Sequence, residues 1–369
     1  AFSMIFAAYS NPTSFGDLTG NNFIIYYLSH IFADQKFMTI FSALFGVGIV
    51  LMAENIERKG GNPGKVHYKR MFILALFGLL HAYLLWFGDI LFPYAIAGMI
   101  VFTARKKSPK FLFITAFIML LLCSLMMLML GFTIPYWEAE DLQLMQAMWA
   151  PTQELIAQDK LANLGSWLEQ TEQRNFMASK MQSNILFYLP RIIALMMIGM
   201  ALFKLDFFGK LFANKTLITN GVIAFIVSFI LIVYGNKQNF SGNWGLDVMF
   251  SGMQFNYWGS ILMAYSYLCF LIVFCRSSSF ILLKRALANV GRMALTNYLS
   301  QSIICGFIFY GWGIGLYGSF ERLEQFLVVL AIWLFQLLFS TFWMNRFQFG
   351  LFEWLWRSLT YSKMQALQK

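Results

Sequence analysis

The sequence predicts an all-α protein, a polytopic transmembrane helical bundle, on three observations. Hydrophobic residues make up 59% of the chain and charged residues only 12%, far from the balance of a soluble domain. The apolar residues are gathered into nine stretches. The loops between these stretches alternate between basic and non-basic, which gives the bundle a sidedness in a bilayer.

The nine apolar stretches are the predicted spans. Most are long enough to cross a hydrocarbon core of about 30 Å at about 1.5 Å per residue. They cover residues 37–53, 71–87, 90–104, 111–132, 185–203, 217–234, 257–275, 293–311 and 325–344. The second and third are short and meet at a Gly88–Asp89 turn, so we expect them to form a hairpin.

The basic residues predict which loops face the cytoplasm. Twenty of the 27 Lys and Arg residues lie in five alternate segments, and the other loops hold five. The five segments are 54–70, 104–110, 204–216, 276–292 and the tail after 344. Because basic loops are retained inside during insertion, these segments and the C-terminus are predicted to be cytoplasmic. The net charge of +10 then favours contact with membrane lipids. The basic residues are scattered over short loops and form no single patch, so no nucleic-acid partner is predicted.

The parity of the spans predicts a further helix. Nine spans that end in the cytoplasm must begin outside, and the chain opens with AFSMIFAAYS, which has no initiator Met. We therefore expect one more N-terminal span before Ala1. A removed signal peptide is the alternative.

The chain is predicted to form a single membrane domain over residues 1–369 with two peripheral segments. The extracytoplasmic loop 133–183 is rich in Glu, Gln, Met and Ala, which favours two amphipathic helices over a mobile loop. The tail 345–369 contains FEWLWRSLTY, and its Trp and basic residues predict an interfacial helix on the cytoplasmic face. The segment 21–35 also looks amphipathic and is expected along the outer surface.

Ionisable residues within spans are costly and therefore mark candidate sites. His81 follows Arg70 by eleven residues, about 16 Å along a helix, and an imidazole there can exchange a proton near neutral pH. A structural bond to a neighbouring helix is the alternative. Asp89 lies at the tip of the hairpin, either as a catalytic group or as a turn-former or helix cap.

Two cations also lie at or within spans. Arg191 is near the outer end of its span, and Asp89 at similar depth is a candidate partner that could orient a substrate with it. The alternative is that Arg191 reaches the outer interface. We expect Lys36 to be an interfacial anchor. The glycines of SALFGVG, Gly46 and Gly48, are expected to permit close helix contact.

The segment GRMALTNYLSQS, 291–302, is the densest polar run within a predicted span. Asn297 and Gln301 are four apart and face the same way, at depths of roughly 7–15 Å from Arg292 that overlap the depth of His81. Thr296 and Ser300 form an adjacent stripe. These side chains either line a cavity or join helices together. The Cys and His residues show no metal-ligand spacing, so no metal is predicted.

Four motifs resemble a known family. KFMTIFSALFGVG, GLLHAYLLWFGDILFPYAIAG, GRMALTNYLSQS and FEWLWRSLTY resemble, in this order, the YeiB-like family of bacterial inner-membrane proteins, whose C-terminal half is domain of unknown function 418. Members begin with a helix that carries an LDxxRG motif, which this chain lacks. They usually have Pro where Leu351 stands here, whereas Glu353 and Arg357 match. The resemblance implies a multi-pass protein of the bacterial inner membrane.

The family is in turn distantly similar to the membrane acyltransferases, which implies one function. An acyl group would pass from a cytoplasmic acyl-CoA-type donor to an extracytoplasmic glycan, lipid or small-molecule acceptor. His81 would act as general base, and Asn297, Gln301 or Thr296 would stabilise the oxyanion. Arg70 and Arg292 would hold donor phosphates, while Asp89 and Arg191 would orient the acceptor.

A transporter or a lipid-binding protein without catalysis is the alternative function. The same groups would then line a translocation path, with His81 as a proton relay. Inverted repeats, common in transporters, are not visible in the sequence. The shape of the cavity around His81 discriminates between the two functions. The sequence gives no acceptor and no oligomeric state.

Overall fold

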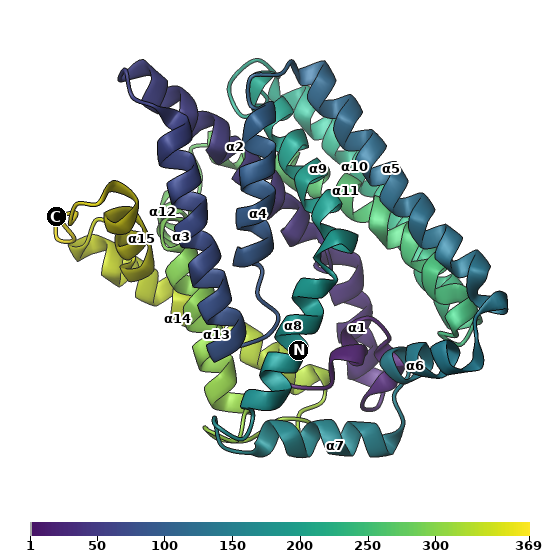
Figure 1. The fold of residues 1–369 in the computed structure, drawn as a ribbon. Helices are drawn as coiled ribbons and strands as arrows, with labels where there is room; N and C mark the ends of the chain where they lie inside the picture. Colours follow the sequence, from purple (N-terminus) through teal and green to yellow (C-terminus); the bar gives the residue numbers. More distant parts are fainter. Residues whose placement is uncertain (1) are drawn as a thin grey trace.

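The computed structural model describes residues 2–369, which form helices joined by turns and contain no strand (Figure 1). The α-helices are α1 Gly20–Phe32, α2 Lys36–Arg58, α3 Pro63–Leu84, α4 Leu91–Val101, α5 Pro109–Thr133, α6 Ala139–Trp149, α7 Gln153–Leu164, α8 Thr171–Ser183, α9 Ile185–Lys204, α10 Asn214–Ser241, α11 Leu246–Arg276, α12 Ile281–Arg292, α13 Ala294–Phe309, α14 Arg322–Arg346 and α15 Leu351–Tyr361. Each of the nine predicted spans lies on one of these helices, so the all-α prediction is confirmed.

Six helical segments in the described chain are long and apolar enough to cross a membrane. They are Gly20–Arg58, Pro109–Tyr136, Ile185–Lys204, Asn214–Ser241, Leu246–Arg276 and Arg322–Arg346. The apolar helices α4 and α13 are shorter, and α3 carries Lys65, Lys69 and Arg70 in its first turns. The class of multi-span membrane protein is therefore supported, but the count of nine spans is not confirmed.

Sequence signals at the helix starts explain several boundaries. The side chain of Asn62 accepts from the Lys65 amide before α3, and Ser108 accepts from the Phe111 amide before α5. A proline occupies the first helical position of both helices, where its missing N–H costs nothing. These caps set the turns that return the chain between α2 and α3 and between α4 and α5.

The centre of the bundle is α9, which packs against α2, α4 and α5. A Cβ atom on Gly46 of α2 would overlap the Met196 carbonyl of α9, and a Cβ on Gly199 would overlap the Ala43 carbonyl. The two glycines therefore let the backbones of α2 and α9 touch, as expected for small residues at helix contacts. Gly48 has open space around its Cα, so only one of the two predicted glycines serves this contact.

The segment 133–183 forms a cap of three α-helices, α6, α7 and α8, whereas two were expected. Figure 1 shows α7 crossing one end of the bundle. Asp159 of α7 accepts hydrogen bonds from Tyr317 Oη at 2.5 Å and Gln173 Nε2 at 2.9 Å, which joins the cap to the segment between α13 and α14. Burial raises the pKa of Asp159 above its usual value, although these hydrogen bonds act in the opposite direction.

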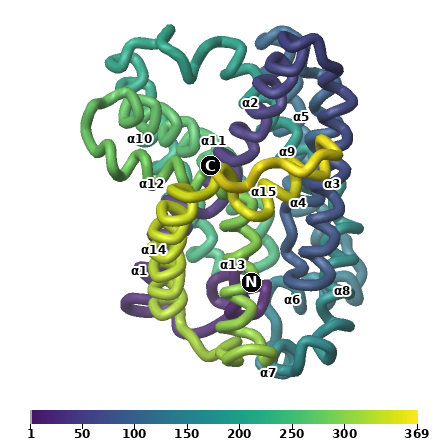
Figure 2. The backbone as a smooth tube through the Cα atoms, turned by 90° about the vertical axis from the view of Figure 1, so that its left-hand side faces the viewer, coloured from purple at the N-terminus to yellow at the C-terminus, as the bar shows by residue number. Residues whose placement is uncertain are grey.

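The tail forms α15, which contacts α3 and α13 and lies across the molecule between α14 and α3 (Figure 2). Glu353 Oε1 accepts from the backbone amides of Leu295 at 2.6 Å and Thr296 at 3.0 Å, and thus caps the start of α13. Trp356 Nε1 donates to the Arg70 carbonyl at 2.9 Å. The expected helix is present, and Glu353 and Trp356 dock it onto the bundle.

We expect Gly46→Ala to destabilise the protein and Gly48→Ala to leave it unchanged or slightly more stable. The first substitution forces α2 away from α9, an overpacking that costs about 1–3 kcal/mol. The second gains helix propensity, worth up to about 1 kcal/mol. Melting temperatures in one detergent measure the difference, and equal melting temperatures for the two variants would contradict the α2–α9 contact.

Candidate active site

The structure brings three buried polar side chains into one line. His81 Nδ1 lies 2.8 Å from Asp89 Oδ2, and His81 Nε2 lies 2.7 Å from Ser302 Oγ. The side chains of His81 and Asp89 are 0% and 3% exposed, and Ser302 is also buried. This is the order of contacts found in a carboxylate–imidazole–hydroxyl catalytic triad.

Three separate elements contribute to this line. His81 lies in the last turn of α3, Asp89 in the connection to α4, and Ser302 in the middle of α13. Asp89 Oδ1 accepts from the Phe92 amide at 2.7 Å and so caps α4. A Cβ atom on Gly78 would overlap this amide and the Asp89 carboxylate, so the glycine permits the start of α4 to approach α3. Asp89 is therefore both a helix cap and a partner of His81.

The hydrogen-bond partners fix the roles of the imidazole nitrogens. Both oxygens of Asp89 accept, one from a backbone amide and one from His81 Nδ1. When Nδ1 donates to Asp89, a neutral ring has a free lone pair on Nε2, which can accept from the Ser302 hydroxyl; the Tyr298 carbonyl, 3.5 Å from Ser302 Oγ, is the other acceptor of that hydroxyl. Tyr298 Oη lies 3.5 Å from Nδ1 and accepts from the Ile90 amide at 3.2 Å. The arrangement can therefore draw a proton from Ser302.

Asn297 and Gln301 do not contact His81, contrary to the expected shared layer. Gln301 Nε2 donates to Gln336 Oε1 of α14 at 2.7 Å, and Asn297 Nδ2 donates to Ser340 Oγ at 3.0 Å. Both amides do face the same way, but that face meets α14. Successive residues of a helix are separated by about 100°, so the next face of α13, which carries Ser302, is the one that meets α3.

The three remaining predicted residues near the tail are also placed apart from His81. Thr296 Oγ1 donates to Glu353, and Arg292 donates to the Gln348 carbonyl at 3.0 Å from an exposed position. The Arg70 guanidinium lies 4.1 Å over the Trp356 ring and lines a cavity of about 110 Å³ between α2 and α3. Only Arg70 of these three thus borders a cavity.

Arg191 does not pair with Asp89, so the expected ion pair is wrong. Its Nη2 donates to Ser260 Oγ at 2.9 Å and to the Tyr257 carbonyl at 3.3 Å, because α9 turns this side chain toward α11. Lys36 was expected to be an interfacial anchor but is fully buried, with Nζ 2.6 Å from Asn256 Oδ1 and from the His30 carbonyl. Both cations belong to the interior of the bundle.

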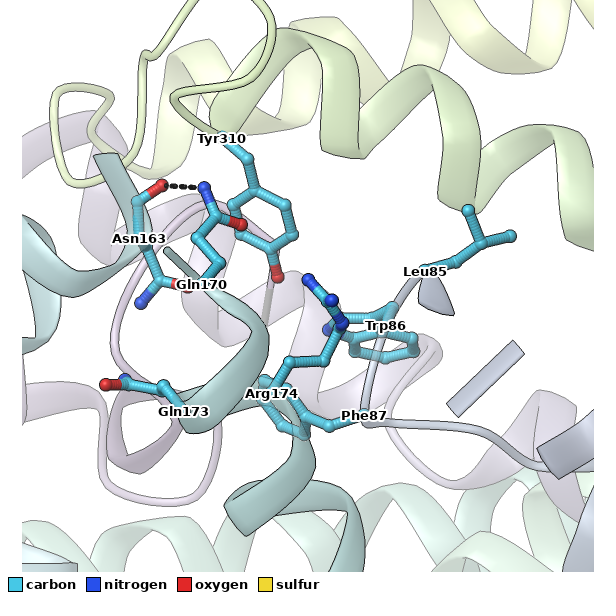
Figure 3. Close-up of a pocket in the computed structure, with 8 residues that line it drawn as sticks. All are labelled: Leu85, Trp86, Phe87, Asn163, Gln170, Gln173, Arg174 and Tyr310. Atoms are coloured by element: carbon cyan, nitrogen blue, oxygen red, sulfur yellow. Dashed lines mark hydrogen bonds between the residues drawn. The ribbon is translucent and has the colours of Figure 1, made fainter. Parts of the chain in front are cut away.

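A small pocket lies beside the hairpin tip, between α3 and the cap (Figure 3). It has a volume of about 10 Å³, enough for about one water molecule. The Trp86 ring in its wall lies 6.3 Å from the His81 ring, and the buried Trp86 N–H has no acceptor among the described residues. Arg174, whose pKa burial lowers, donates to the Tyr83 carbonyl at 2.7 Å. The Trp86 ring therefore borders the pocket and lies near the imidazole.

Comparison with known proteins identifies the family of this chain. The described helices and the buried polar line define a multi-span helical membrane protein. Residues 202–363 match the family described as "Protein of unknown function (DUF418)". The chain is 30% identical over 348 residues to "Uncharacterized protein YxaH" of Bacillus subtilis (strain 168), covering 92% of this chain and 82% of the relative.

It is also 30% identical over 374 residues to "Uncharacterized protein YeiB" of Escherichia coli (strain K12), covering 98% of this chain and 90% of that protein. A third relative, the "Uncharacterized 39.9 kDa protein in amylase 3'region" of Bacillus acidopullulyticus, is 26% identical over 353 residues, covering 90% and 82%. The chain therefore belongs to the DUF418, or YeiB-like, family. No solved structure gives a significant match.

Sequence reasoning missed Ser302 and Tyr298. Both lie in the polar run that it singled out, and they are four residues apart, as are Asn297 and Gln301. The spacing therefore predicts two polar faces on α13 equally well. Nothing in the sequence indicates which of the two faces meets His81, because this depends on how α13 is rotated against α3 and α14.

We expect Gln301 to be a packing residue coupled to Gln336. Gln301→Leu and Gln336→Leu should each lower stability, and the double variant should cost less than the sum of the two. The expected coupling is about 0.6 kcal/mol and at most about 1.7 kcal/mol, as for other hydrogen bonds between membrane helices. Unfolding of the four proteins in detergent measures it, and strictly additive losses would contradict the pairing.

Proposed function

We propose that this protein is a membrane-embedded acyltransferase that passes an acyl group from a cytoplasmic acyl-CoA-type donor to an extracytoplasmic acceptor. The Asp89–His81–Ser302 line carries the proposal. A hydroxyl that donates to an imidazole, itself oriented by a carboxylate, is the arrangement that activates a serine nucleophile.

The reaction proceeds in two steps through Ser302. As Ser302 Oγ bonds to the thioester carbonyl carbon, its proton passes to His81 Nε2, the C–S bond breaks, and the leaving thiolate takes that proton. The acceptor hydroxyl or amine then attacks the resulting serine ester. Its proton passes to His81 and on to Ser302 Oγ as the ester C–O bond breaks. Asp89 stabilises the imidazolium in both steps.

Burial favours transfer over hydrolysis. The imidazole is fully shielded and the adjoining pocket holds about one water, so an acyl ester on Ser302 is protected from bulk solvent. The cavity beside Arg70 and Trp356 lies toward the basic loops and suits the anionic donor. The pocket bounded by Trp86 and Arg174 lies toward the cap, on the side from which the acceptor would approach. This assignment of the donor to the cytoplasmic side and of the acceptor to the opposite side uses the topology predicted from the basic loops.

Lipid binding without catalysis is the second candidate function. One observation favours it: a large cavity of about 750 Å³ is not lined by His81. In the acyltransferase that we propose, a route to His81 must open from either side when substrate binds, as occurs in enzymes whose sites close around substrate.

Acyl-enzyme formation tests the proposal without knowledge of the acceptor. Purified protein in lipid nanodiscs is incubated with radiolabelled acetyl-CoA, denatured, and counted for label that alkaline hydroxylamine releases. We expect label on the unsubstituted protein and none on Ser302→Ala. His81→Ala should slow labelling by about 10²–10⁴-fold, and the double variant should be no worse than Ser302→Ala.

Ser300→Ala is the matched control, because Ser300 lies on the same helix and its hydroxyl donates to the Asn297 carbonyl. It should label normally. Addition of a membrane lipid and glycan extract should then discharge the label. Transfer to the extract that survives Ser302→Ala would contradict the serine step, and transfer by His81→Ala at the rate of the unsubstituted protein would contradict this site altogether.

A further inference from the structure

A second candidate site lies in a large cavity away from His81. The cavity has a volume of about 750 Å³ and is bounded by α2, α5, α9 and α11, with α6 at one end; Figure 1 shows α6 at the end of these helices where the cap lies. Six methionines contribute to its wall, which is otherwise largely aliphatic and aromatic. None of the residues of the Asp89–His81–Ser302 line borders it.

Arg191 is the single charged residue in the cavity wall. Its Nη2 donates to Ser260 and Tyr257, and its guanidinium lies 4.1 Å over the Tyr257 ring. No carboxylate within residues 2–369 comes within 4.0 Å of it. Asp34, the acidic residue of this region, bonds to His30 and Asn256 instead. Most of the Arg191 donors are therefore left for a ligand.

An unpaired guanidinium beside an apolar cavity favours an anionic ligand. Burying a charge without a counter-charge is costly, and neutral acceptors and an aromatic ring offset only part of that cost. A planar guanidinium matches a carboxylate or a phosphate with two parallel hydrogen bonds. The charge of Arg191 therefore indicates the chemistry of the ligand head group.

The remainder of the wall indicates the chemistry of the ligand body. The cavity falls within the range of about 300–1,000 Å³ typical of ligand pockets, and methionine side chains adapt their shape to flexible apolar ligands. A polar chamber of about 70 Å³ adjoins it and shares Gln35 and Met253 with its wall. This chamber has room for several waters, which could hydrate a head group at Arg191.

We propose that the cavity binds an amphiphile with one acyl chain and an anionic head group, held by Arg191 through a carboxylate or phosphate. The chain lies among the methionines. This inference does not rest on the acyltransferase proposal, because the cavity and the catalytic line share no residue and the test measures binding alone.

Equilibrium binding to the full chain in phosphatidylcholine nanodiscs tests the inference. The probes are radiolabelled palmitate, lysophosphatidate with a palmitoyl chain, and uncharged palmitoyl glycerol. We expect one or both anionic probes to bind more tightly than the uncharged probe, and the tighter of the two identifies the head group. Arg191→Gln should weaken the anionic probes on the order of 10- to 100-fold and leave the uncharged probe unchanged.

Two further variants keep the test decisive. Met145→Trp, on α6, narrows the cavity and should weaken all three probes alike. Arg276→Gln removes a cation that bonds to the Phe212 carbonyl outside the cavity and should change nothing. Equal binding of charged and uncharged probes, or an Arg191→Gln variant that folds and binds palmitate and lysophosphatidate as before, would overturn the inference.

Discussion

Polar side chains inside the bundle must find partners within it, because lipid offers none, and this constraint governs how the helices are rotated. The buried polar groups divide into a small number of interhelical contacts: His81 with Asp89 and Ser302, Asn297 with Ser340, and Lys36 with Asn256. The His81–Ser302 and Lys36–Asn256 contacts join helices whose bonded residues are 221 and 220 positions apart in sequence. Apolar packing alone is tolerant of rotation, whereas a bonded amide or imidazole fixes one angle.

The helices could be predicted from the sequence, and their faces could not. Apolar stretches of span length give the positions of all nine expected helices, and composition anticipates helices in the cap and the tail. Two pairings depend on packing instead. Asp89 pairs with His81 and not with Arg191, and Ser302 rather than Gln301 meets the imidazole. A one-residue difference on α13 moves a side chain by about 100°, and only the neighbouring helices α3 and α14 decide which face each receives.

Helix α4 connects the two candidate sites. Asp89 caps its start, and Tyr94, one turn further on, lines the large cavity and bonds to Ser42 Oγ at 2.6 Å. The close approach of this helix to α3 at Gly78 leaves little freedom at the Asp89 end. A ligand that shifts Tyr94 would therefore act on the carboxylate that orients His81, through one rigid element rather than through a chain of side chains.

The contrast between buried Lys36 and half-buried Arg191 separates a structural role from a binding role. Lys36 has no ion-pair partner within 4.0 Å either, but Nζ is held by an amide oxygen and a backbone carbonyl at 2.6 Å, and it does not line the large cavity. Arg191 bonds to protein acceptors through Nη2 alone and borders that cavity. A cation needed only for packing would be enclosed, as Lys36 is. Arg191 keeps donors at the surface of an apolar space. Packing does not offset the desolvation cost of its charge there, whereas an anionic ligand would offset it by supplying a counter-charge.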